Sequence, residues 1–215
     1  MRKITETENN QKNTLEDYQP NANIQERLKK KREKLIPAGA MLLSVLIDLV
    51  RDGEFVSEFS AEKIVYFLQR FGAKKTFKLE FQPNFYGPYS GNVKKVLYYL
   101  NGSYITGYSS KDKKPFEELS LMVNAEKEVN DYLDSQENAQ NKEIVLKTKA
   151  FLSGFYGNFS LELLSTVDYI ITDKKTNSVT EITTHLENWS NRKKTLFTNP
   201  KFISLAVQNI EKHLA

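Results

Sequence analysis

Apolar residues recur at helical spacing along most of the chain from Pro37 onward, which predicts a mainly helical domain. A first helix is expected from Pro37 to near Gly53. A second runs from Ser60, its expected N-cap, to Gly72, where glycine ends it. Further helices are expected at about residues 93–101, 124–134 and 141–155, and then from Ser160, from Ser178 and from Pro200.

Two segments alternate apolar and polar residues with a period of two, as half-buried strands do. They are Thr76–Phe81 and Leu119–Val123, and the segment from Tyr104 to Tyr108 also has an extended pattern. The predicted fold is therefore mainly α with a small β element (α+β). We expect a compact multi-helix domain over residues 36–215, preceded by a disordered basic tail or interdomain linker over residues 1–35.

The positive charge of the chain is concentrated in the predicted tail. The net charge is +4, and residues 1–35 carry nine Lys and Arg against six Asp and Glu, so the predicted domain is almost neutral. A dedicated nucleic-acid binder usually carries its basic residues on a folded face. The charge pattern therefore gives only weak support to direct nucleic-acid binding.

The sequence lacks the residues that several kinds of catalytic, metal and phosphate-binding site need. The chain has no cysteine, its two histidines lie 28 positions apart, and it contains no glycine-rich phosphate loop, HExxH or GxSxG motif. No apolar run approaches the roughly 20 residues that a membrane-spanning helix needs. We therefore expect a cytoplasmic protein that has no metal site, no cofactor, no membrane partner and no catalytic residues.

A turn-rich loop, Phe85-Tyr86-Gly87-Pro88-Tyr89, is the first candidate contact surface. Gly87 allows a positive φ, and Pro88 keeps Gly87 out of the helical region, so the turn should be stiff. Stiff tyrosines give contact area at low entropic cost. Phe85 is better explained as a core residue that anchors the turn, while Tyr86 and Tyr89 suit either a core or a contact role.

Aromatic residues mixed with lysines form a second candidate surface: Tyr104, Tyr108, Lys113, Lys114 and Phe116. Such a mixture suits stacking on bases or docking in a partner groove. Taken alone, an ordinary surface loop explains it better. Elsewhere, Trp189–Lys194 is best explained as a solvated helix end with Trp189 on the core. Four acidic residues have no partner that sequence spacing identifies: Asp48, Glu62, Glu162 and Asp168.

Five ordered blocks resemble the C-terminal domain of DarG antitoxins. They are residues 61–69 (AEKIVYFLQ), 85–90 (FYGPYS), 100–108 (LNGSYITGY), 154–155 with 161–167 (GF and LELLSTV), and 189–194 (WSNRKK). The resemblance as a whole covers about residues 36–215. The first two blocks are also similar, more loosely, to the SocA-like (Panacea) antitoxin domains.

The resemblance implies an antitoxin role. DarT toxins use NAD to attach ADP-ribose to bases of single-stranded DNA, and DarG proteins carry a macrodomain that removes it and a C-terminal domain that binds the toxin. Residues 1–35 are too few and too polar for a macrodomain, so glycohydrolase activity is not expected of this chain. We expect direct binding of a DarT-type toxin that blocks its DNA-binding or active-site cleft. The acidic residues Asp112, Glu117 and Glu118 are available to replace phosphates there.

The expected partner-binding residues are the tyrosines and the lysine-containing loop of the two candidate surfaces: Tyr86, Tyr89, Tyr104, Tyr108, Lys113, Lys114 and Phe116. The alternative function is a single-stranded nucleic-acid-binding module that uses the same tyrosines and lysines.

Overall fold

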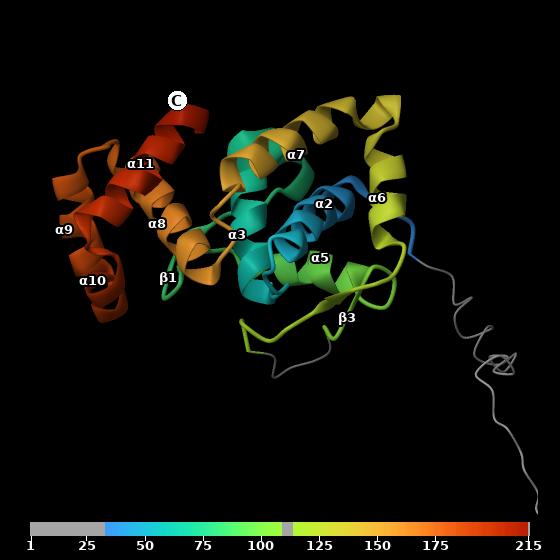
Figure 1. The fold of residues 1–215 in the computed structure, drawn as a ribbon, viewed down its shortest axis with the longest axis horizontal. Helices are drawn as coiled ribbons and strands as arrows, with labels where there is room; N and C mark the ends of the chain where they lie inside the picture. Colours follow the sequence, from blue (N-terminus) through green and yellow to red (C-terminus); the bar gives the residue numbers. More distant parts are fainter. Residues whose placement is uncertain (1–32, 109–113, 215) are drawn as a thin grey trace, which may run out of the picture. The chain divides into compact units, whose positions relative to one another are not determined.

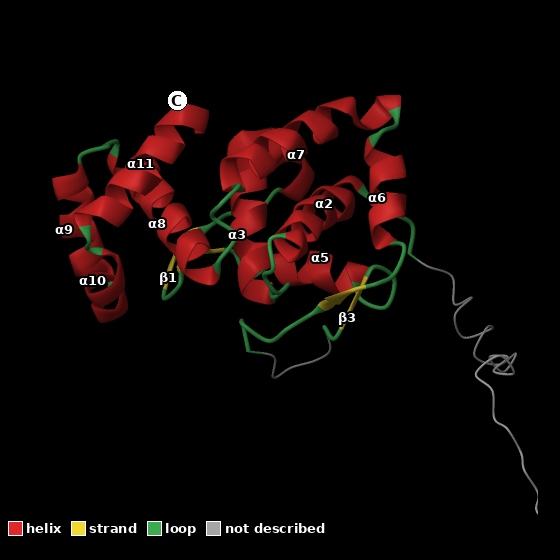
Figure 2. Ribbon diagram, viewed as in Figure 1, coloured by secondary structure: helices red, strands yellow, loops and turns green. Residues whose placement is uncertain are grey.

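A computed structural model describes residues 33–108 and 114–214 of the chain. These residues form helices and two small antiparallel sheets (Figures 1 and 2), which confirms the predicted mainly α fold with a small β element. No helix in these two ranges is both long and apolar enough to cross a membrane. The predicted tail, residues 1–35, lies outside the described residues except for its last three.

The elements follow one another along the chain in a fixed order. The N-terminal half contains α2 (Pro37–Arg51), α3 (Glu58–Leu68), the π-helical turn η2 (Gln69–Ala73), α4 (Lys74–Phe77), β1 (Gln82–Asn84), β2 (Gly87–Tyr89), α5 (Val93–Leu100), β3 (Ile105–Thr106) and β4 (Ser120–Leu121). The C-terminal half contains α6 (Ala125–Leu133), the 3-10 turn η3 (Gln136–Asn138), α7 (Ala139–Leu152), α8 (Asn158–Lys174), α9 (Val179–Trp189), α10 (Asn191–Phe197) and α11 (Pro200–Leu214).

Helix α2 occupies the centre of the core. It packs against α3, α5, α6 and α7, and ten of its fifteen residues are buried. A helix that is apolar on all sides has to be enclosed by other elements. The apolar stripes of the surrounding helices supply that enclosure.

Helix α3 begins one turn earlier than the sequence predicts. Its N-cap is Ser57, whose hydroxyl accepts from the Ser60 backbone N–H at 3.1 Å, while Ser60 Oγ accepts from the Ser57 N–H at 2.9 Å. Ser60 is therefore the third residue of a capping box and not the cap itself. As a consequence, Glu58 and Glu62 both belong to the helix and lie four residues apart on one face.

The strand predicted over Thr76–Phe81 is wrong. Gly72 adopts a φ of 122°, and the chain continues into α4 before Lys78 ends that helix at a φ of 54°. The side-chain amide of Gln69 donates to the Leu79 carbonyl at 2.8 Å and accepts from the Leu79 N–H at 2.9 Å. A side chain thus occupies the backbone groups that a neighbouring strand would have used.

A hairpin of β1 and β2 stands where the sequence predicts only a turn. Its register pairs Gln82 with Tyr89 and Asn84 with Gly87, so that two residues form the loop. The sequence does not predict these strands because each contains a proline, a residue that is depleted in strands. Gly87 has a φ of 91°, which confirms the predicted positive φ. The second sheet pairs β3 with β4, which confirms the strand predicted within residues 119–123 and the extended segment predicted within residues 104–108.

The C-terminal helices differ from expectation at two places. Helix α8 begins at Asn158 after Gly157, so Ser160 lies inside it and is not its cap. Asn191–Phe197 forms α10, which begins within the segment Trp189–Lys194 that is predicted as a solvated helix end. The N-cap of α9 is confirmed, because Ser178 Oγ accepts from the Glu181 N–H, and α11 opens at Pro200 as expected.

Gly87 lies so close to α8 that it should not tolerate a side chain. An added Cβ would sit 2.6 Å from Thr166 Oγ1, in addition to the strain of the positive φ. We expect Gly87→Ala to lower the free energy of unfolding by about 1–2 kcal/mol from backbone strain and by about 1–3 kcal/mol more from overpacking. Urea unfolding measures this loss.

Gly53→Ala is the matched control. Gly53 has a φ of 88° and nothing within 4 Å of its added Cβ, so only the strain should appear. Equal losses in the two variants would show that the hairpin does not press against α8 in solution.

Candidate functional site

Two buried charged side chains of α3 hold the hairpin in place. Lys63 Nζ donates to the Pro88 carbonyl at 2.7 Å. The Glu62 carboxylate accepts from the Ser90 N–H at 3.1 Å and from the Gly91 N–H at 3.0 Å. These bonds fix β2 and the turn after it on the helix, although the hairpin has only a short ladder of its own.

Another buried charged residue, Glu162 of α8, fixes α10 beside the hairpin. Lys193 Nζ donates to Glu162 Oε1 at 2.6 Å, and Arg192 donates to both carboxylate oxygens through Nε and Nη2 at 3.1 and 2.9 Å. Lys193 is fully buried. The segment Trp189–Lys194 is thus structural, and the prediction of a solvated end is wrong for Lys193. The packing of Trp189 on the core is confirmed.

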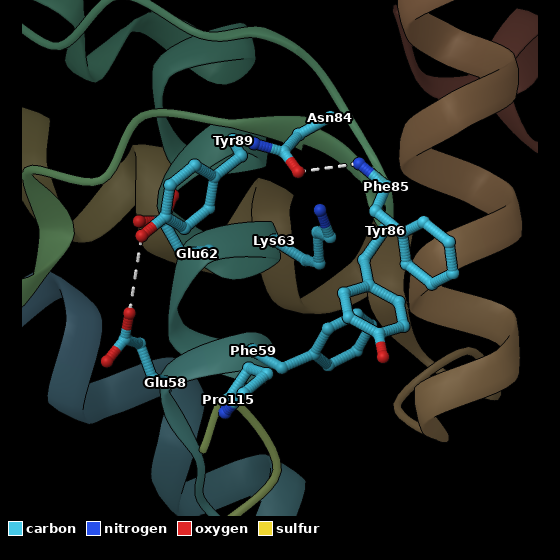
Figure 3. A pocket seen from close by; sticks show the side chains of 9 residues that line it. All are labelled: Glu58, Phe59, Glu62, Lys63, Asn84, Phe85, Tyr86, Tyr89 and Pro115. Carbon is cyan, nitrogen blue, oxygen red and sulfur yellow. Dashed lines mark hydrogen bonds between the residues drawn. The ribbon is translucent and has the colours of Figure 1, made fainter. Parts of the chain in front are cut away.

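A pocket of about 370 Å³ lies between the hairpin and the start of α3 (Figure 3). We call it the hairpin pocket; it is lined by Glu58, Phe59, Glu62, Lys63, Asn84, Phe85, Tyr86, Tyr89 and Pro115. Figure 3 shows Glu58 and Tyr89 on one side, Phe85 and Tyr86 on the other, and Lys63 between them.

Aromatic rings form one continuous wall at this pocket. Tyr86 contacts Phe85 at 4.8 Å, Phe116 at 5.0 Å and Phe59 at 6.1 Å between ring centroids, in each case edge to face. Phe59 and Phe116 also lie 4.7 Å apart. The Arg192 guanidinium lies 5.3 Å from the centre of the Tyr86 ring, which links the wall to the buried Glu162.

The structure brings only some of the predicted contact residues together. Tyr86 and Tyr89 line the hairpin pocket, and Phe116 adjoins it. Lys114 is exposed on the same loop as Phe116, whereas Lys113 and Asp112 lie outside the described residues. Phe85, which was expected in the core, is 54% exposed at the hairpin tip.

Tyr104 and Tyr108 are not surface residues, contrary to expectation. Their exposed fractions are 3% and 4%. Tyr104 donates its hydroxyl to the Glu33 carbonyl at 3.1 Å, and Tyr108 donates to Glu58 Oε2 at 2.8 Å. Both rings therefore support the fold, and the Tyr108 hydroxyl contacts Glu58 at the pocket.

Burial moves the pKa values of the two α3 side chains toward each other. It raises the pKa of Glu62 to about 7, because the Ser90 and Gly91 amides and Lys63 compensate only in part. Burial, together with the charge of Lys193, lowers the pKa of Lys63 to about 7. At Glu162, burial is outweighed by hydrogen bonds from Arg192 and Lys193, which lower its pKa.

The remaining acidic candidates take part in separate networks. Asp168 accepts from the Tyr66 hydroxyl at 2.6 Å and from Arg70 Nε at 2.7 Å, and Asp48 pairs with Lys149 at 3.0 Å. No two of these carboxylates form a dyad. In the two described ranges no group of three or more His, Cys, Asp or Glu side chains is placed to hold a metal ion.

Comparison with known proteins identifies relatives of one name. No model of a protein family matches the chain. It is 30% identical over 166 residues to a DNA ADP-ribosyl glycohydrolase of Thermus aquaticus, and 23% identical over 158 residues to proteins of the same name from Mycobacterium tuberculosis and Mycobacterium bovis. The alignments cover 77% and 72% of this chain but 44% of each relative. The chain is thus related to these proteins and spans less than half of their length.

Replacing Glu62 should change how stability depends on pH. Because the folded state raises the pKa of Glu62 from 4.5 to about 7, it binds this proton more tightly than the unfolded state does. The contribution of Glu62 to the free energy of unfolding is therefore complete below about pH 4.5 and is lost as the pH rises through about 7. Glu62→Gln should flatten this decline, as urea unfolding across that range would measure. A parallel profile in both proteins would contradict the assignment.

Removal of the Glu162 charge should destabilise the folded protein. Glu162→Gln leaves Lys193 buried without its counter-ion, and we expect a loss of about 3–5 kcal/mol in the free energy of unfolding. The exposed pair of Glu143 and Lys147 provides the control, since Glu143→Gln should leave the free energy of unfolding almost unchanged. Comparable small losses at both sites would show that the buried pair is not a stability determinant.

Proposed function

We propose that this chain neutralises a DarT-type DNA ADP-ribosyltransferase toxin by binding it directly and blocking its DNA-binding or active-site cleft. The observation that carries this proposal is the exposed aromatic surface around the hairpin pocket. The relatives support the choice of system, because their name refers to ADP-ribosyl groups on DNA. We also propose a cytoplasmic location, where a toxin of this class meets DNA.

The surface around the hairpin pocket has the character of a binding site. Phe85, Phe116 and Tyr89 are 54%, 41% and 37% exposed, although side chains of this type favour burial. Lys63 and Glu62 hold the hairpin backbone on both sides of Tyr89, so little conformational entropy of the hairpin remains to be lost on binding. Aromatic anchors of this kind carry much of the energy of protein interfaces.

Binding also fits this site better than catalysis. Glu62 and Lys63 have pKa values near 7, as catalytic groups often do. Both are engaged by backbone groups of the hairpin, however, and both are almost fully buried. Their perturbed pKa values are explained by a structural role. We therefore propose that this chain contributes recognition to the system and not glycohydrolase activity.

Mixing the chain with a DarT-type toxin tests the proposal. We expect a complex in size-exclusion chromatography and loss of NAD-dependent ADP-ribosylation of a single-stranded oligonucleotide. Absence of a complex at micromolar concentrations would refute it. A parallel titration of the chain with the oligonucleotide alone tests the nucleic-acid alternative, which requires binding that weakens steeply as salt rises.

Phe85→Ala should weaken toxin binding without unfolding the chain. Truncating an aromatic anchor typically costs more than about 1–2 kcal/mol of binding free energy, which corresponds to roughly a tenfold higher Kd. Leu205→Ala on α11 is the control, because Leu205 is 57% exposed and far along the chain from the hairpin. Isothermal titration calorimetry measures both. Equal affinities would exclude the hairpin tip from the interface.

A further inference from the structure

The hairpin pocket contains two glutamates, of which Glu62 lies near the buried Lys63 and Glu58 has no described cation beside it. Glu58 and Glu62 both line it, from adjacent turns of α3. Among the described residues, the ion pairs within 4.0 Å use other carboxylates, and none uses Glu58 or Glu62. Like charges four residues apart on a helix repel each other. This arrangement favours a positive group from outside.

Two tyrosine hydroxyls orient the Glu58 carboxylate at the pocket. Its Oε2 accepts from the Tyr108 hydroxyl at 2.8 Å and its Oε1 from the Tyr89 hydroxyl at 3.5 Å (Figure 3 draws the second bond). A carboxylate oxygen can accept more than one hydrogen bond, so both atoms retain capacity. The two hydroxyls orient the carboxylate but leave its charge in place.

Lys63 does not neutralise Glu58. Its ammonium group is almost fully buried and donates to the Pro88 carbonyl. Its nearby electrostatic partners are Glu62, Glu162 and Lys193, and Glu58 is not among them. Among residues 33–108 and 114–214, the half-buried Glu58 thus has no cation within ion-pair distance.

The aromatic wall suits a cation as well. Rings attract cations placed over their faces within about 6 Å. The fold already uses this property, since Arg192 lies over Tyr86 and Lys63 lies 5.4 Å from the centre of Phe59. Phe116 extends the same wall toward solvent, and Tyr89 lies on the opposite side of the pocket, beside Glu58.

We propose, on the premise of the toxin-binding function above, that the hairpin pocket receives an arginine side chain of the toxin, with its guanidinium between Glu58 and the aromatic wall. A volume of about 370 Å³ is at the low end for ligand pockets, which suits one side chain better than a cofactor. Arginine fits better than lysine, because its planar group forms paired hydrogen bonds to a carboxylate and stacks on rings.

Glu58→Gln tests this pocket in the complex with the toxin. We expect about a tenfold higher Kd at low salt, and a smaller dependence of the Kd on salt than in the parent, because one ion pair is lost. Tyr89→Phe, which keeps the ring and removes the hydroxyl, should weaken binding by a smaller factor. Calorimetry at two salt concentrations measures both. Unchanged affinity of Glu58→Gln at both concentrations would overturn the proposal.

Glu137→Gln is the matched control for these variants. Glu137 is also a first-turn glutamate, on the exposed turn η3, so its replacement removes a similar helix-end charge. We expect the parent Kd for this variant. Thermal unfolding of each variant, compared with the parent, identifies any loss of affinity that comes from misfolding.

A small-molecule probe tests the pocket independently of toxin binding. In nuclear magnetic resonance titrations, N-acetyl-arginine methylamide should shift resonances of Phe59, Tyr86 and Tyr89, and the shifts should vanish in Glu58→Gln. The neutral isostere N-acetyl-citrulline methylamide should leave them unchanged. If the parent fails to bind the toxin, the proposed function fails, and these shifts still decide whether the pocket selects a guanidinium. Equal shifts with both compounds, or none with either, would refute it.

Discussion

The buried carboxylate of Glu162 is the charge on which the candidate site depends. It holds Lys193 and Arg192, and these two residues fix α10 against α8. Arg192 in turn lies over the Tyr86 ring, which forms one wall of the hairpin pocket. Burying the charges of Glu162 and Lys193 together is costly unless their hydrogen bonds are well formed, so the positions of these residues and of Arg192 constrain one another. The outer aromatic surface is therefore coupled to the core through a chain of side chains.

The hairpin owes its rigidity to side chains and not to a sheet. Its strands contain three residues each, and a two-stranded ribbon of that size is marginal in water. Glu62 and Lys63 instead bond its backbone, Trp189 donates its ring N–H to the Asn84 carbonyl at 3.0 Å, and Gly87 lies against Thr166. Three helices thus support one exposed tip, a fixed support for the aromatic residues displayed there.

The sequence predicts the features of the fold that depend on local spacing. Helix α2 and the later helices follow from apolar periodicity, and Gly87 follows from its neighbour Pro88. The contacts that define the site join residues far apart in the chain, and no local pattern encodes them. The local sequence of Tyr108 resembles that of a surface aromatic residue. Its hydroxyl in fact donates a hydrogen bond to Glu58, which lies 50 residues earlier in the chain. Phe85 fails for the opposite reason: its apolar character suggests the core, but the two-residue loop of the hairpin turns it outward.

Gln69 has a consequence beyond local geometry. Residues 76–81 alternate apolar and charged side chains, and such a segment, if extended and unpaired, can recruit a strand from another molecule. The Gln69 side-chain amide bonds both the N–H and the carbonyl of Leu79, the two backbone groups through which a neighbouring strand would pair. A strand from another molecule would therefore have to displace the Gln69 amide before it could pair with the backbone at Leu79.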